Sequence, residues 1–213
     1  MRTVLVANPK GGSGKTTLAT NLAAYLANRN EKVALWDLDR QGSSIGWLEM
    51  RAEQLPRISS FQPGAKMSET DWLVLDSPAG LHGKNLSRLV KLARMVVVPV
   101  QPSLFDMEAT KTFMQQILEE KAVRKHHAEI ALIGMRVDAR TRAAARLEEF
   151  LAEFDLPVLT HLRNAQAYVN TSFEGQSLFD LPQGQVRRDL EQWQPLLAWI
   201  EKTGQKPRLS RNG

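Results

Sequence analysis

The sequence feature that most constrains the fold is a glycine-rich loop near the start of the chain. Residues 3–7 read TVLVA, a short apolar run that predicts a buried strand. Residues 8–17 follow as NPKGGSGKTT, and apolar residues recur at helical spacing over 16–28. A strand, a glycine-rich loop ending in Gly-Lys-Thr, and a helix form the arrangement that surrounds a polyphosphate with backbone N–H groups. The loop therefore predicts a phosphate-binding α/β protein.

The rest of the chain continues this alternation of strands and helices. Strands separated by helices indicate a doubly wound, mostly parallel sheet with helices on both faces. The chain has 213 residues and no long linker, so we expect one domain over 1–202 and a basic, flexible tail over 203–213. Further strands are predicted at 32–36, 72–75, 95–100, 130–134 and 157–159, and further helices at 103–125 and 142–154.

Composition excludes several classes of site. The chain contains no cysteine, which excludes disulfides, thiolate catalysis and iron–sulfur clusters. No apolar run approaches the ~20 residues that a membrane span needs. The formal net charge is +5, a modest excess that permits a nucleic acid or an anionic surface as partner without requiring one.

Each residue type in the loop has a use for a bound polyphosphate. Glycines let the backbone turn its N–H groups inward, at φ angles that a Cβ would strain. Lys15 is placed to contact the β- and γ-phosphates, and the Thr16 hydroxyl to bind Mg²⁺. The positive end of the following helix adds to the attraction. The residues expected to line the phosphates are Gly11, Gly12, Ser13, Gly14, Lys15, Thr16 and Thr17.

Three carboxylates follow two of the predicted strands. Asp37 and Asp39 leave the strand at 32–36 two residues apart, so they lie on one side of an extended segment. Asp76 follows the apolar strand at 72–75. Parallel sheets bind ligands at the carboxyl ends of their strands, so these groups could organise Mg²⁺ and an attacking water. The alternative is an ordinary solvated turn.

Taken together, these segments resemble the deviant Walker A ATPases, the family of ParA and MinD. The loop carries the family signature K-G-G-x-G-K-T-T. The segment DLDRQG at 37–42 is similar to the family's D-x-D-P-Q-G, with Arg40 in place of proline, and WLVLDSPAG at 72–80 is similar to its Walker B strand. The segment VPVQPSLFD at 98–106 is similar to a further ParA motif. The resemblance covers nearly the whole chain.

The resemblance implies a chemistry for the site. ATP and Mg²⁺ are the implied cofactors, and the choice of ATP over GTP rests on the resemblance alone. Thr16, Asp37 and Asp76 are the implied metal residues, and Asp39 is implied to orient or activate the hydrolytic water. Lys10 is implied to reach the partner's nucleotide across a dimer, which makes Lys10, Lys15 and Asp39 the expected catalytic residues.

The resemblance also implies a function, that of a short ParA-type ATPase without an N-terminal helix-turn-helix domain. Such a protein hydrolyses ATP slowly, dimerises on ATP, binds DNA non-specifically, and segregates or positions a plasmid, a chromosome region or a cargo. A ParB-like adaptor is the expected stimulating partner, and the nucleoid region of the cytoplasm is the expected location. Two alternatives stay open: a MinD-like or cargo-positioning regulator acting on a protein cluster or division site, and a nucleotide-gated binding module with little hydrolysis.

Arginines in the last third of the chain are the candidate DNA contacts. Basic side chains can hold DNA phosphates without reading sequence. A solvated helix with internal ion pairs is the alternative, because Glu148, Glu149 and Glu153 lie nearby. The candidates are Arg142, Arg146, Arg163, Arg187 and Arg188.

An apolar stripe near the C-terminus is the last feature. Its residues recur at intervals of three and four, as on one face of a helix. Such a helix could lie on a membrane, but Pro195 and the basic residues that follow favour a helix packed on the core. We therefore expect no membrane partner. The stripe consists of Val186, Leu190, Trp193, Leu197 and Ile200.

Overall fold

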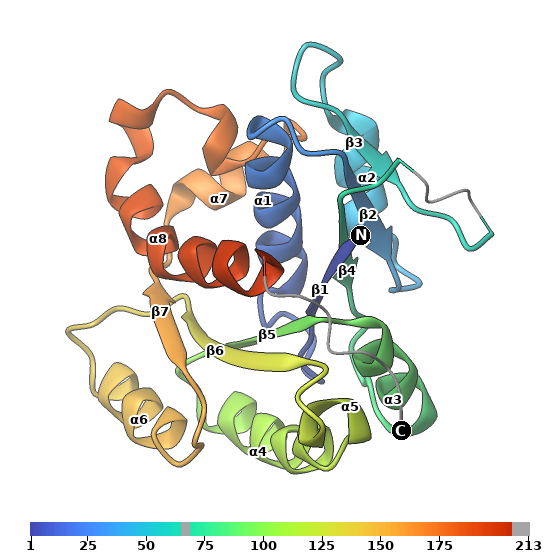
Figure 1. Cartoon of the computed structure of the whole chain (residues 1–213). Coiled ribbons are helices and arrows are strands. Elements are labelled where there is room, and N and C mark those ends of the chain that lie inside the picture. The colour runs from blue at the N-terminus through green and yellow to red at the C-terminus, as the bar shows by residue number, and fades with distance from the viewer. Residues whose placement is uncertain (65–68, 206–213) are drawn as a thin grey trace.

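The computed structural model describes residues 1–64 and 69–205 and contains a seven-stranded sheet (Figure 1). The strand order is β3-β2-β4-β1-β5-β6-β7, and every neighbouring pair is parallel. The predicted doubly wound sheet is therefore confirmed. The strands are β1 (Arg2–Val6), β2 (Val33–Asp37), β3 (Ile58–Ser60), β4 (Trp72–Asp76), β5 (Met95–Val100), β6 (Glu129–Met135) and β7 (Val158–Leu162).

Helices cover both faces of the sheet, so each central strand is buried on two sides. Val4 and Val6 of β1 belong to the core on one face, whereas Leu5 belongs to the core on the other. Helices α1, α2, α7, η1 and α8 pack on the first face, and α3, α4, α5 and α6 on the second. Their bounds are α1 (Lys15–Asn28), α2 (Ser43–Met50), α3 (Gly83–Leu92), α4 (Leu104–Leu118), α5 (Lys121–Arg124), α6 (Arg142–Leu151), α7 (Gln166–Ser172), η1 (Leu178–Asp180) and α8 (Gln183–Gln205).

The position of β1 at the centre of the sheet determines where a ligand can bind. The chain passes from β1 to β2 on one side, and from β4 across β1 to β5 on the other. A reversal of this kind opens a crevice at the carboxyl ends of the strands. The phosphate loop follows β1, and the acidic segments follow β2 and β4. The fold therefore brings all three motifs to one edge.

The prediction of one long helix over 103–125 is wrong, because the structure divides this segment into two helices. Helix α4 ends at Leu118 and α5 begins at Lys121. Between them Glu120 has an extended backbone (φ −61°, ψ 131°) and accepts a hydrogen bond from Ser87 Oγ of α3 at 2.7 Å. The break turns the chain toward α3, a tertiary contact that apolar periodicity does not encode.

The C-terminal stripe packs on the core, as predicted. Val186, Trp193, Leu197 and Ile200 are at most 3% exposed, and Leu190 packs against the same cluster. Pro195 lies inside α8 without ending it. Within residues 1–64 and 69–205, none of the helices is both long enough and apolar enough to cross a bilayer.

The described part of the last helix includes residues beyond the expected boundary at residue 202. Helix α8 continues to Gln205, and Thr203 is 1% exposed. The division into a domain over 1–202 and a tail over 203–213 stays a prediction. The rest of the expected tail, 206–213, lies outside the described residues.

Candidate functional site

The phosphate loop joins β1 to α1, and two of its glycines need their special backbone. Gly12 and Gly14 have φ angles of 77° and 94°, and a Cβ on Gly14 would lie 2.7 Å from the Met135 side chain. Gly11 lies outside the positive-φ region, so the strain expected there from the sequence is absent. Helix α1 begins at Lys15 without a side-chain cap. The amides of its first turn are thus available to an anion.

Lys15 points back into the loop. Its ammonium group donates a hydrogen bond to the carbonyl of Lys10 at 2.6 Å and one to Ser13 Oγ at 3.4 Å. The residue is only 7% exposed. Burial lowers the pKa of Lys15, whereas the charges of Asp76 and Asp39 act in the opposite direction. The Lys15 ammonium can therefore bind the oxygens of a polyanion. The two carboxylates near it can interact with a metal ion that the polyanion carries.

Thr16 and Asp76 lie together at the start of α1 and the end of β4. The Thr16 hydroxyl donates to Asp76 Oδ2 at 2.8 Å. Asp76 is 1% exposed, and burial raises its pKa to about 6 although the hydrogen bond from Thr16 opposes the rise. The other oxygen, Asp76 Oδ1, is buried and accepts no hydrogen bond from the described residues. A hydroxyl beside an unsatisfied carboxylate oxygen fits Mg²⁺, which takes few protein ligands and keeps water and phosphate oxygens.

Asp37 anchors the loop that follows β2. Its Oδ1 accepts from the Asp39 N–H at 2.9 Å, and its Oδ2 accepts from the N–H groups of Ser44 and Ile45 at 2.8 and 3.2 Å. The carboxylate therefore satisfies amides at the start of α2. Its charge also contributes to the raised pKa of the neighbouring Asp76. This geometry places Asp37 beside the Thr16–Asp76 pair, with its oxygens directed to backbone amides.

Asp39 bridges the loops that follow β2 and β4. Its Oδ2 accepts from the Ala79 N–H at 3.3 Å, and its Oδ1 accepts from the Gln41 N–H at 3.1 Å. Its charge acts on Lys15, so the carboxylate lies at the same edge as the phosphate loop. The adjacent Arg40 is exposed. The structure thus brings Lys15, Thr16 and the three carboxylates into one site.

Two contacts to the phosphate loop were not predicted from the sequence. Gln101, after β5, donates from its side-chain amide to the carbonyl of Gly12. The N–H of Gly80, after β4, donates to the carbonyl of Pro9 at 2.8 Å. Both residues lie in segments that resemble ParA motifs. Their position directly after a predicted strand is the sequence signal that could have indicated a contact with the phosphate loop.

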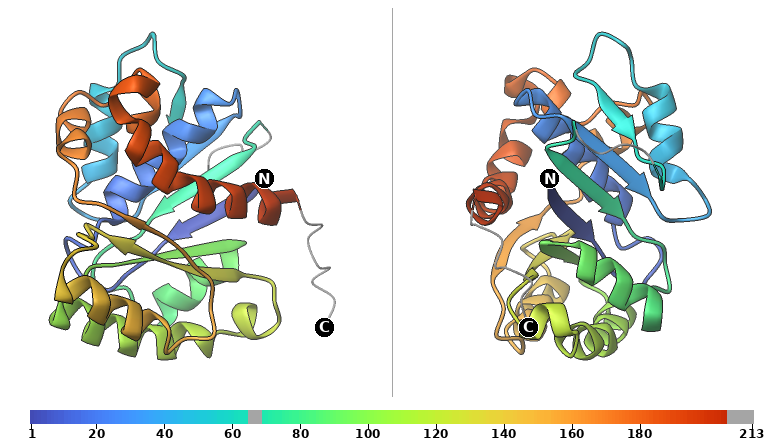
Figure 2. Two further views of the ribbon diagram at one scale, coloured as in Figure 1. Left: turned by 90° about the vertical axis from the view of Figure 1, so that its left-hand side faces the viewer. Right: turned by 45° about the vertical axis from the view of Figure 1, so that its right-hand side comes forward.

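The five candidate DNA-binding arginines do not share one surface. Arg142 and Arg146 lie on α6, whereas Arg187 and Arg188 lie on α8, which covers the opposite face of the sheet (Figure 2). Arg163 donates two hydrogen bonds to Asp189 at 2.7 and 2.9 Å. Because Asp189 is 2% exposed, Arg163 neutralises a buried charge.

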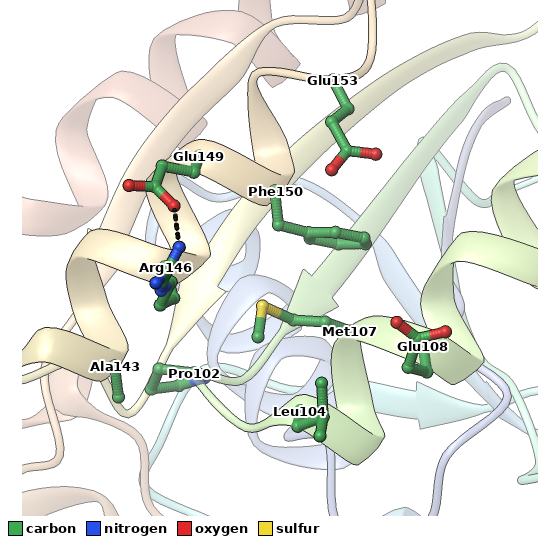
Figure 3. Close-up of a pocket in the computed structure, with 9 residues that line it drawn as sticks. All are labelled: Pro102, Leu104, Met107, Glu108, Ala143, Arg146, Glu149, Phe150 and Glu153. Carbon is green, nitrogen blue, oxygen red and sulfur yellow. Dashed lines mark hydrogen bonds and ion pairs between the residues drawn. The ribbon is translucent and has the colours of Figure 1, made fainter.

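Two of the other arginines are also engaged in ion pairs. Arg146 contacts Glu149 at 2.9 Å and lines a cavity of about 450 Å³ between α4 and α6, whose apolar wall includes Met107 and Phe150 (Figure 3). Arg187 pairs with Glu191 at 3.0 Å. Arg142 and Arg188 are exposed and have no ion-pair partner within residues 1–64 and 69–205.

Comparison with known proteins places this site in a family. Residues 4–179 match the CobQ/CobB/MinD/ParA nucleotide binding domain. The chain belongs to this family. The matched region runs from β1 into η1, so it contains the phosphate loop and the acidic segments after β2 and β4.

Two relatives in this family are similar to this chain over most of their own length. The maintenance of carboxysome distribution protein A of Halothiobacillus neapolitanus is 30% identical over 192 residues, 84% of this chain and 87% of that protein. The chromosome-partitioning ATPase Soj of Thermus thermophilus is 30% identical over 188 residues, 70% of this chain and 74% of Soj.

Solved structures of the family share the fold. An ATP complex of a Cyanothece McdA variant has a TM-score of 0.72 at 16% identity, covering 99% of both chains. A putative plasmid partition protein from Borrelia burgdorferi, bound to AMPPNP, has a TM-score of 0.69 at 19% identity, covering 93% of this chain and 99% of that one. The MinD cell division protein of Aquifex aeolicus has a TM-score of 0.69 at 17% identity, covering 99% of this chain and all of that one (100%).

Proposed function

We propose that this chain is a Mg-dependent ATPase that acts as a dimerising switch. The observation that carries the proposal is the cluster of Lys15, Thr16 and Asp76 at the start of α1, with Asp39 at the same edge. In this proposal the amides of the loop and the Lys15 ammonium bind the phosphates, and Thr16 and Asp76 hold the metal with Asp37 beside them. Bound Mg²⁺ supplies positive charge that stabilises the phosphate oxygens during transfer.

Asp39 is the proposed residue for the attacking water. Its carboxylate is tied at both oxygens by backbone N–H groups, so it stays oriented toward the crevice and can accept a hydrogen bond from water. Asp37 holds the Asp39 amide and thereby fixes the loop. The exposed Arg40 beside it replaces the family's proline, which leaves a nucleotide-gated module with little hydrolysis as an outcome of the assay below.

Lys10 is proposed to act across the dimer. Its side chain is half-buried, and within residues 1–64 and 69–205 its ammonium has no ion-pair partner. The same residue's carbonyl already accepts the Lys15 ammonium, so its backbone belongs to one site while its side chain remains available to the site of a second copy.

The proposed output is the segregation or positioning of DNA or another cargo, with non-specific DNA binding by the dimer and stimulation by a ParB-like adaptor. Likeness to Soj supports the partition role. Likeness to two maintenance of carboxysome distribution proteins supports the second candidate, the positioning of a protein cluster. The proposed location is the cytoplasm at the nucleoid.

Phosphate release and molecular mass in solution test the switch. The wild type, Lys10→Ala, Lys15→Ala and Asp39→Ala are compared with Mg-ATP and Mg-ADP, with the exposed Lys91→Ala as matched control. We expect Lys15→Ala to lose nucleotide binding, Asp39→Ala to bind and dimerise without turnover, and Lys10→Ala to bind as a monomer. Undiminished ATP affinity in Lys15→Ala would refute the loop assignment.

A mobility shift on arbitrary DNA separates the outputs. Binding with ATP and not with ADP supports the nucleoid-bound switch. Absence of DNA binding in either state, with turnover intact, favours a regulator that acts on a protein cluster without DNA. Dimerisation on ATP with no phosphate release, alone or with DNA, favours the nucleotide-gated module.

A further inference from the structure

A buried asparagine at the start of the phosphate loop connects that loop to another part of the fold. Asn8 follows β1 and has no exposed surface (0%). Its side-chain nitrogen donates to the carbonyl of Pro99 on β5 at 2.8 Å and to Thr110 Oγ1 on α4 at 3.0 Å. Its side-chain oxygen accepts the N–H of Lys10 at 2.8 Å. Both amide hydrogens and the oxygen are thus engaged.

Together with further hydrogen bonds of the Lys10 backbone, these bonds form a series that runs from α4 to the ammonium of Lys15. Asn8 closes a turn over Pro9 by accepting the Lys10 N–H, as asparagine side chains commonly do. The carbonyl of Lys10 then accepts the Lys15 ammonium at 2.6 Å and Ser13 Oγ at 3.1 Å. The Lys10 backbone is therefore held on one side by Asn8 and on the other by Lys15.

Thr110 supplies the one contact in this series that comes from a helix remote in sequence. It lies in the middle of α4, 102 residues from Asn8, and is 0% exposed. The neighbouring Phe113 and Met114 are buried in the same core as β5, so the helix cannot slide without disturbing that packing. A hydroxyl fixed in this way holds the Asn8 amide in one orientation.

We propose that Asn8 and Thr110 are positioning residues that hold the phosphate loop in its binding conformation and couple it to α4. The inference rests on the proposed nucleotide site. It adds that nucleotide binding also requires a contact outside that site, between Asn8 and Thr110. If Thr110 lost its hydroxyl, one N–H of Asn8 would stay buried without an acceptor, and the side chain would gain from turning away. The Lys10 backbone and the Lys15 ammonium would then lose their common support.

Thr110→Val tests this because valine keeps the shape and removes the acceptor. We expect affinity for a fluorescent ATP analogue with Mg²⁺ to fall about tenfold, which corresponds to about 1.4 kcal/mol. Thr110→Ser keeps the hydroxyl and is expected to stay within about twofold of the wild type. Thr171→Val is the matched control, since Thr171 is buried (4%) on α7 and, among residues 1–64 and 69–205, its hydroxyl bonds only to carbonyls of its own helix.

Three results would overturn the coupling. These are wild-type affinity in Thr110→Val, an equal loss of affinity in Thr171→Val, or no recovery in Thr110→Ser. If the wild type itself binds no nucleotide, the proposed function fails instead, so the two failures are distinguishable.

Amide hydrogen exchange in the wild type keeps the inference testable if Thr110→Val does not fold. Binding of the analogue with Mg²⁺ is expected to slow exchange in α4 around Thr110 as well as in the phosphate loop, while α7 serves as the reference. Protection confined to the phosphate loop would show that α4 does not share in binding, and the coupling would be refuted.

Discussion

Asp76→Asn should make the nucleotide-free protein more stable at neutral pH, although it removes a proposed metal ligand. The Asp76 carboxyl is buried beside Asp37, and burial is the main cause that raises its pKa from 3.8 to about 6. In the folded chain the ionised form is therefore disfavoured. Asparagine keeps an oxygen that can accept the Thr16 hydroxyl and never ionises.

The size and sign of the effect follow from the two pKa values. A folded-state pKa above the unfolded one means that the folded protein binds the proton more tightly, so this contribution is present below about pH 4 and is lost as pH rises through about 6. At 1.36 kcal/mol per pKa unit, the difference between 3.8 and about 6 amounts to about 3 kcal/mol. The pKa of about 6 already includes the attraction to Lys15, so we expect a gain of about 3 kcal/mol well above pH 6.

Urea unfolding in EDTA, without nucleotide, between about pH 4 and pH 8 measures the effect. The difference in free energy of unfolding between Asp76→Asn and wild type should be small near pH 4 and should grow to its full value above about pH 6. Asp155→Asn, which changes an exposed loop carboxylate, is the matched control and should show little change.

An Asp76→Asn protein that is less stable than wild type at pH 8, or a difference independent of pH, would refute the reasoning. A second arm tests the function of the carboxylate. Adding Mg-ATP should stabilise the wild type far more than the variant, because ligands stabilise only the state that binds them. An equal stabilisation would remove Asp76 from the proposed metal site.

Three further predictions concern separate parts of the molecule. Arg51→Met should lower the free energy of unfolding by about 3–5 kcal/mol in urea titrations, because Arg51 bonds both oxygens of Asp180 at 2.9 Å and the Asp180 side chain has no exposed surface (0%). A loss below about 1 kcal/mol would show that the pair is not needed. Arg142→Ala should weaken DNA binding and reduce the slope of log affinity against log salt by about 1, and an unchanged slope would place the DNA surface elsewhere. Arg163→Ala should lower the unfolding midpoint and leave the salt slope unchanged, because its guanidinium neutralises the buried Asp189; a lower slope with unchanged stability would contradict this.

The sequence predicted the fold and the meeting of its motifs at one edge of the sheet because both depend on local patterns. Apolar runs such as Met95–Val100 are fully buried in the structure, and the glycine-rich loop lies where a strand gives way to a helix. The acidic segments then meet at one edge as a consequence of parallel topology. Short elements such as β3 and η1, three residues each, have too few residues to show a period and were missed.

The parts that the sequence did not predict are contacts between residues far apart in the chain. Asn8 and Asp180 occupy positions that look like ordinary turn residues in the sequence, yet the side chain of each is buried. Asn8 is bonded to Thr110 of α4, and Asp180 to Arg51, which directly follows α2. Arg163 was assigned to a DNA surface because a basic side chain in a loop gives no sign of its partner, and Asp189 lies 26 residues away. Composition and periodicity report which faces are apolar, whereas partner choice among polar groups depends on the packed fold.

This difference bears on how the proposed switch could work. The residues that a motif identifies, Lys15, Thr16 and Asp76, are the ones proposed to contact the ligand directly. The residues that only the structure identifies connect this edge to the rest of the fold: Gly80 and Gln101 hold the loop from the neighbouring strands, and Asn8 holds it from α4. Because the phosphate loop is held from three sides, its conformation can change little by itself. We therefore expect binding or loss of the γ-phosphate to shift the neighbouring loops and α4. Nucleotide state would then be transmitted through contacts with those elements, which makes them the places where mutations should uncouple binding from output.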